Sequence, residues 1–230
     1  MGFLTIYRAE LDTFSSKISS DVNASFSDSY KSYTTAQGIV VLNDASKEFG
    51  GGLVSNNYAV PAGAKYFGLD ITYNISADDL AHLARNEMDL KITLASGASS
   101  PIPNQANGSA QQNFSEGGMW QLDPTGKTWV DSGYNPGLPA PGTNRMQFRY
   151  WSDGTKWSVT GLRANGGAPF VPDPTKFANI PMITTNWGTG LHPQLQTEVW
   201  KAPWFLRQCY SQVWVLASDV QIPWNIGLTN

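Results

Sequence analysis

The chain has 230 residues, of which 14% are charged, with a formal net charge of −3 and an abundance of Gly (22), Pro (14) and Trp (9). A charged fraction well below the usual value of about 25% argues against coiled coils, helical bundles and charged disordered tails. The slight negative charge offers no basic surface for nucleic acid, and no apolar run approaches the roughly 18 residues that a membrane span needs. We therefore expect one globular domain with neither of these partners.

Residues 1–36 are polar and Ser-rich with weak periodicity, and we expect an irregular lead-in packed on the domain. Residues 37–230 are expected to form a single β-sandwich domain. The apolar patch in residues 1–7 is too short for the core of a signal peptide. The localisation stays open, and a secreted or cell-surface protein is expected if a signal was removed.

From residue 37 onward, apolar and polar residues alternate with a period of two, and Gly, Pro, Asn and Asp interrupt the pattern. A short helix is expected near 76–84, with Ser76 as its N-cap. Asp153-Gly154 and Asn165-Gly166-Gly167 predict tight turns, the first of them within a hairpin. The predicted strands cover 38–42, 66–76, 87–92, 119–122, 127–130, 146–151, 156–162, 193–200 and 211–217. This pattern predicts an all-β fold, a two-sheet antiparallel jelly-roll sandwich with one short helix.

One predicted strand places Glu87, Asp89 and Lys91 side by side on one face, while Met88 and Leu90 lie on the other. Two long acidic side chains at positions i and i+4 of a strand, about 13 Å apart at Cα, could lean together across a sugar as a retaining glycosidase requires, but here the i+4 position is Lys91. A protonated lysine is a poor general acid. The same pattern also fits an ion-paired, exposed strand face, so both interpretations stay open.

A second predicted strand places His192, Gln194, Gln196, Glu198 and Trp200 on one face. Amides and carboxylates can hydrogen-bond to hydroxyl groups, and an indole offers an apolar plate for the C–H face of a sugar ring. This combination predicts glycan binding, although an ordinary exposed polar face looks the same.

All nine tryptophans lie between Trp120 and Trp224. We expect Trp120 and Trp200 to serve as stacking plates, with Gln121 as a polar neighbour of Trp120. No motif for zinc, for an EF-hand calcium loop or for a nucleotide occurs, so no cofactor or metal is expected. Calcium held by scattered loop oxygens is left open.

Together these strands resemble the concanavalin A-like lectin/glucanase superfamily. Asn86-Glu87-Met88-Asp89-Leu90-Lys91 looks like the Glu-x-Asp-x-Glu strand of laminarinase-type glycoside hydrolases. The resemblance implies Glu87 as the nucleophile and Asp89 as its supporting carboxylate, and Lys91 stands where the motif has its acid/base residue. Residues 117–133, 145–165 and 210–215 look more like uncharacterised microbial proteins of this superfamily, which implies a jelly-roll fold.

The preferred hypothesis is a non-enzymatic, lectin-like protein that binds an oligosaccharide or polysaccharide. A second hypothesis is a polysaccharide hydrolase or lyase with Glu87 and Glu198 as its carboxylate pair, assisted by Asp89. A third is a structural or self-assembling sandwich, for which a homo-oligomer is expected. The expected ligand-binding residues are Gln194, Gln196, Glu198, Trp200, Trp120, Gln121 and His192.

Overall fold

The structure is a computed structural model, which describes residues 1–8, 15–18, 30–35, 38–43, 51–54, 58–83, 87–96, 110–113, 118–122, 129–153, 156–177, 180–181, 191–200 and 206–228. Side chains are described within residues 1–8, 58–78, 80–81, 118, 130–153, 158–175 and 212–228. The other strands are described by their backbone course and register.

Strands dominate the described residues, and the two helices are short. The strands are β1 (Leu4–Arg8), β2 (Ser15–Ile18), β3 (Tyr30–Thr35), β4 (Gly38–Asn43), β5 (Gly51–Val54), β6 (Tyr66–Ile75), β7 (Glu87–Ser96), β8 (Ala110–Asn113), β9 (Met119–Leu122), β10 (Trp129–Tyr134), β11 (Gly142–Ser152), β12 (Lys156–Ala164), β13 (Ile180–Pro181), β14 (Leu191–Trp200) and β15 (Leu206–Ser218). The helices are α1 (Ala77–Leu83) and α2 (Pro174–Phe177).

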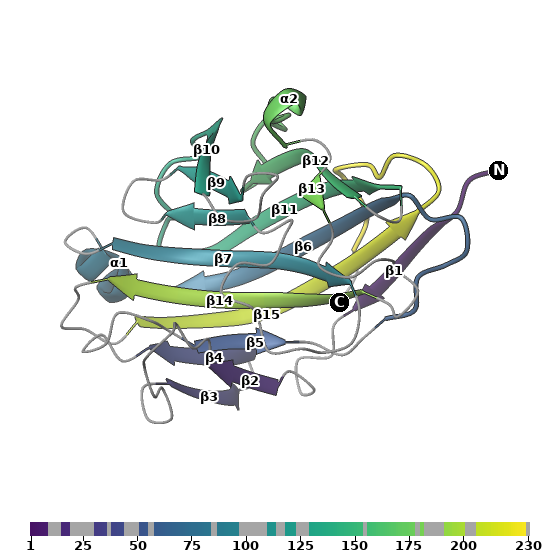
Figure 1. Ribbon diagram of the computed structural model, residues 1–230. Helices are drawn as coiled ribbons and strands as arrows, with labels where there is room; N and C mark the ends of the chain where they lie inside the picture. The colour runs from purple at the N-terminus through teal and green to yellow at the C-terminus, as the bar shows by residue number, and fades with distance from the viewer. Residues whose placement is uncertain are drawn as a thin grey trace.

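The strands form two antiparallel sheets. Sheet A has eight strands in the order β13-β12-β11-β6-β15-β4-β3, with β1 beside β15. Sheet B has seven strands in the order β10-β9-β8-β7-β14-β5-β2. Figure 1 shows β7 and β14 of sheet B in front of β6 and β15 of sheet A. The chain changes sheet repeatedly along the described strands, and the changes from β6 to β7 and from β14 to β15 link central strands of the two sheets.

The all-β antiparallel fold predicted from the sequence is confirmed. Each predicted strand overlaps an observed one, and α1 covers most of the predicted helix. The predicted turn after β12 is also confirmed, because Asn165 and Gly166 have φ values of 47° and 72° and Gly167 N donates to Ala164 O at 2.9 Å. β11 and β12 form the predicted hairpin, although the turn residues 154–155 lie outside the described residues.

Within residues 1–36, where the sequence predicts an irregular lead-in, the described residues include three strands. They form β1 and β3 in sheet A and β2 in sheet B. β2 and β3 lie at the ends of their sheets, where short polar strands are common because few core positions need filling. A weak apolar pattern is therefore compatible with a strand at these positions.

The core of sheet A lies on one face of its three long central strands. On β6 the apolar residues alternate along the strand as the sequence predicts, and the register places apolar residues of β11 and β15 on the same face. These side chains are at most 2% exposed, and burial of each stabilises the fold by roughly 2 kcal/mol. They are Phe67, Leu69, Ile71, Tyr73, Ile75, Met146, Phe148, Tyr150, Val213, Val215 and Ala217.

Period-two alternation predicts a wetter opposite face for β6, and that prediction is wrong at the centre of the strand. Gly68 and Asp70 are buried, and Asp70 is only 1% exposed. The reason is the C-terminal strap, residues 219–228, in which Trp224 O accepts a hydrogen bond from Gln147 on this outer face. Sheet A therefore buries residues on both faces, and the strap that follows β15 covers part of its outer face.

Candidate functional site

The predicted polar strand faces belong to sheet B, where β7 and β14 are neighbours. The register pairs Glu87 with Trp200, Asp89 with Glu198, and Lys91 with Gln196. Residues directly opposite in an antiparallel pair lie on the same face, about 5 Å apart at their Cβ atoms. The two polar rows that the sequence predicts are thus one continuous surface, which we call the polar face of sheet B.

A line of polar and aromatic residues crosses this face perpendicular to the strands. Lys91 on β7 pairs with Gln111 on β8, and Gln111 pairs with Trp120 on β9. On the other side of β7, Lys91 pairs with Gln196 on β14. The line continues to Asp131 on β10 at one end and to Gly52 and Lys17 at the other. An indole, two amides and an ammonium group therefore lie at successive strands on one face.

The carboxylates are grouped next to this line. Asp89 lies opposite Glu198 on one side and opposite Asn113 on the other. Glu87 lies two residues before Asp89, at the start of β7. Glu87 and Glu198 are therefore diagonal neighbours, a relation that places Cα atoms about 7–8 Å apart. Like charges directly opposite one another are unfavourable.

The remaining predicted residues divide between the two faces. His192 and Gln194 share the polar face and lie opposite Ala95 and Thr93. Gln121 does not share it, because Gln121 pairs with Ala110, and Ala110 pairs with Ile92 on the apolar face of β7. Trp120 and Gln121 are consecutive in one strand, so they lie on opposite faces. The register thus places Gln121 away from the other predicted ligand-binding residues.

The sequence interpretation missed Gln111 and Asn113, which the pairing of β8 brings to the polar face. β8 has the sequence Ala110-Gln111-Gln112-Asn113 and no apolar alternation, so period-two reasoning had no signal to use. Its cross-strand partners on β7 and β9 define its role.

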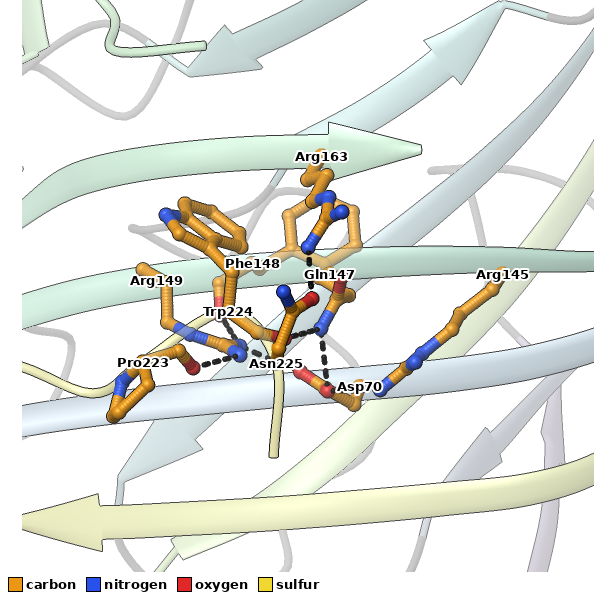
Figure 2. Close-up of polar contacts among 9 residues, drawn as sticks. All are labelled: Asp70, Arg145, Gln147, Phe148, Arg149, Arg163, Pro223, Trp224 and Asn225. Carbon is orange, nitrogen blue, oxygen red and sulfur yellow. Dashed lines mark hydrogen bonds and ion pairs between the residues drawn. The ribbon is translucent and has the colours of Figure 1, made fainter. Parts of the chain in front are cut away.

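A second polar cluster lies on the outer face of sheet A, in the region that the strap covers. Asp70 accepts hydrogen bonds from Arg145 Nη2 at 2.9 Å, from Gln147 Nε2 at 2.8 Å and from Arg149 Nη1. Figure 2 shows these side chains converging from β11 onto Asp70 of β6. Charged groups buried in this way need partners to offset their desolvation, and Asp70 and Arg149 provide them for each other.

The same cluster fastens the C-terminal strap to the sheet. Arg149 Nη2 donates to Pro223 O at 3.1 Å, and its guanidinium lies 4.8 Å from the centroid of the Trp224 ring. Gln147 Nε2 donates to Trp224 O at 2.9 Å, and Arg163 Nη1 donates to Asn225 Oδ1 at 2.8 Å. These three donors, together with the Arg149–Trp224 contact, favour a role of the cluster in holding the strap.

The Trp224 ring lies against the strand at a position that only glycine permits. A Cβ atom added to Gly161 would come within 2.5 Å of Trp224 Cζ2. Glycine is therefore required at residue 161 by the close approach of the indole.

Two features are absent from the described residues: a cluster of metal ligands and a membrane-spanning helix. Among the side chains that the structure describes, no three His, Cys, Asp or Glu residues gather closely enough to hold a metal ion. In the described part of the chain, neither helix has the length and apolar character needed to cross a membrane.

The chain resembles several solved β-sheet proteins in its overall course. An endo-1,3-beta-glucanase from Streptomyces sioyaensis matches with a TM-score of 0.49 and 11% identity, over 89% of this chain and 88% of that chain. The lectin-like defence protein arcelin-5 from Phaseolus vulgaris matches with a TM-score of 0.46 and 10% identity, over 94% and 98%. A xylan-binding module matches with a TM-score of 0.43 and 13% identity, over 93% and 96%.

With identities this low, the likeness concerns the course of the chain and says nothing of activity. No protein-family model and no curated protein matches the sequence.

Proposed function

We propose that the protein binds an oligosaccharide or polysaccharide on the polar face of sheet B, as a lectin-like protein that leaves its ligand intact. The observation that carries this proposal is the register, which aligns Trp120, Gln111, Lys91 and Gln196 across four neighbouring strands. A line of this kind presents hydrogen-bonding groups and an aromatic plate at regular intervals of about 4.8 Å.

The chemistry of these residues suits a hydroxyl-rich ligand. Gln111 and Gln196 carry both donors and acceptors, so each can bond to a hydroxyl in either role. Trp120 and Trp200 can stack on the apolar face of a sugar ring. The carboxylates Asp89 and Glu198 add strong acceptors beside the line. Glycan recognition uses such a mixture of groups, whereas a purely apolar partner would leave them without hydrogen bonds.

Hydrolysis or elimination is the second candidate, because the register places Glu198 opposite Asp89 and diagonal to Glu87. A pair of carboxylates on one face is the starting point of glycoside hydrolysis. Lys91, at the position two residues beyond Asp89, replaces a third acid and favours binding over turnover.

The test uses two adjacent glutamines of the same strand. β8 places Gln111 on the polar face and Gln112 on the opposite one. A glycan array first identifies a ligand for the wild-type protein, and titration calorimetry then measures its affinity for the variants. We expect Gln111→Ala and Gln196→Ala to weaken binding about three- to ten-fold, the value of one hydrogen bond. Trp200→Ala should weaken it by about ten-fold or more.

Gln112→Ala is the matched control and should leave the affinity unchanged. Equal effects of the Gln111 and Gln112 substitutions, or a blank array, would overturn the proposal. Assays for new reducing ends and for unsaturated products on the same glycans distinguish a hydrolase or lyase from a binding protein. Turnover that Glu87→Gln and Glu198→Gln both abolish would establish an enzyme.

A further inference from the structure

A small cavity lies between the outer face of sheet A and the C-terminal strap, away from the polar face of sheet B. Its volume is about 50 Å³. Arg149 of β11 and Thr160 of β12 line it from the sheet, and Ile222 and Trp224 line it from the strap. Val171, which is 68% exposed, forms part of its wall, so the cavity reaches the surface there.

One polar group in this wall has no partner. Arg149 is 4% exposed, and its Nη1 and Nη2 atoms donate to Asp70, to Phe148 O and to Pro223 O. Its Nε atom is buried and has no hydrogen-bond partner in the part of the chain that the structure describes. Nearly all buried donors in folded proteins are satisfied. This N–H therefore needs an acceptor beyond the described residues, and a molecule in the cavity that Arg149 lines can supply one.

The size and lining of the cavity limit what that acceptor is. A water molecule needs roughly 10–15 Å³ of such space, whereas a cavity of about 150 Å³ holds benzene. About 50 Å³ suits a group of a few heavy atoms. The indole of Trp224 and the side chains of Ile222 and Val171 make much of the wall apolar. A small group with an oxygen at one end and a short aliphatic tail therefore fits better than water alone.

The local charge favours an anion. Asp70 is the carboxylate that faces this cluster, and it is shared by two guanidinium groups, those of Arg145 and Arg149. The third nearby guanidinium, of Arg163, donates to Asn225 Oδ1 and to backbone oxygens. Positive charge in this partly desolvated region thus exceeds negative charge, and a monoanion would offset part of the excess.

We propose that this cavity is a binding site for a short-chain aliphatic carboxylate of the size of acetate or propionate. One carboxylate oxygen accepts the hydrogen bond of Arg149 Nε, and the aliphatic tail lies against Trp224 and Ile222. The ligand enters beside Val171. This site is distinct from the proposed glycan-binding face of sheet B, and the carboxylate binds there without being chemically changed.

The side-chain signal of Arg149 Nε in a proton–nitrogen correlation spectrum reports on the site directly. Titration with sodium acetate, against sodium chloride at equal ionic strength, should move this signal saturably, with a dissociation constant on the order of 1 mM for so small a ligand. Acetamide has nearly the same shape without the charge, and it should bind at least ten-fold more weakly. An Arg149 Nε signal that does not respond to acetate, or that responds equally to acetamide, would refute the proposal.

Two exposed valines provide a matched pair of variants that leave Arg149 and its partners intact. Val171→Trp fills the entrance and should weaken acetate binding at least ten-fold. Val220 is 50% exposed and does not line the cavity, so Val220→Trp should bind acetate as the wild type does. Unchanged binding in Val171→Trp would place the ligand elsewhere and overturn the assignment.

Discussion

The substitution Asp70→Asn tests whether the buried cluster on the outer face of sheet A holds the strap in place. Asp70 is 1% exposed and accepts hydrogen bonds from three side chains. Asparagine has nearly the same size but no charge, and one of its two terminal atoms is a donor. At least one of the three donors would therefore lose its acceptor, and the charge of Arg149 would lose its nearest compensation.

The expected cost follows from the burial of the partners. Arg149 has a side chain that is 5% exposed, so its charge cannot turn to water, whereas the side chain of Arg145 is 39% exposed and can. Removing one partner of a buried pair costs about 3–5 kcal/mol. We expect Asp70→Asn to lower the free energy of unfolding by this amount, which corresponds to a fall in Tm of roughly 10 °C for a domain of this length.

Urea denaturation followed by tryptophan fluorescence measures the effect, and two further variants make it specific. Asp131→Asn is the matched control, since Asp131 is exposed and accepts a hydrogen bond from Gly133 N that asparagine can also accept. It should change stability by less than about 0.5 kcal/mol. Combining Asp70→Asn with Arg149→Met removes both charges, so the double variant should lose about 1–3 kcal/mol less than the sum of the singles. A loss below about 1 kcal/mol for Asp70→Asn would refute the reasoning.

Two further predictions concern the same sheet. Gly161→Ala should destabilise the protein by about 2 kcal/mol, because the added Cβ would collide with Trp224. In a protein that already carries Trp224→Ala, Gly161→Ala should cost much less, and urea titration of the single and double variants measures this difference. Burial raises the pKa of the Tyr73 and Tyr150 hydroxyls well above the ordinary value of 10.0, so both stay neutral in the folded protein while the unfolded chain ionises near pH 10. Their contribution to stability is thus complete below pH 10 and is lost above it, by up to about 1.4 kcal/mol per pH unit for each residue. In the double variant Tyr73→Phe/Tyr150→Phe, the urea midpoints at pH 9 and pH 11 should therefore lie closer together than in the wild type. A difference between these midpoints equal to that of the wild type would contradict this account.

The sequence predicted which residues share a face far better than it predicted which strands are neighbours. Alternation along 87–91 and 192–200 assigns polar and apolar positions to opposite faces, because the side chains of a strand alternate by geometry alone. The pairing of Glu198 with Asp89 depends on β14 returning beside β7 after an excursion through both sheets. Register of that kind arises from packing between distant segments, and no local pattern records it.

The misjudged positions share a physical cause. Asp70 was assigned to a wet face because its strand alternates, yet the strap buries it together with Arg149. Gln121 was grouped with Trp120 through adjacency in the chain, although adjacency in a strand separates two side chains by a sheet thickness. In both cases the local pattern predicts which face of its strand a residue lies on. What covers that face, and which residues share it, depends on the strap and on the sheet pairing.

The separation of the two sheets also allows the two proposed sites to be tested independently. Gln111 and Gln196 lie on the polar face of sheet B, whereas the cluster around Asp70 and the adjoining cavity lie on the outer face of sheet A. A substitution such as Gln196→Ala should change glycan affinity with little effect on stability, since the register places Gln196 on the polar face. Asp70→Asn should change stability while leaving glycan affinity intact at temperatures where the protein stays folded. A variant on one sheet that altered both properties would show that the sheets are coupled, and the polar face could then no longer be treated as a preformed surface on a rigid support.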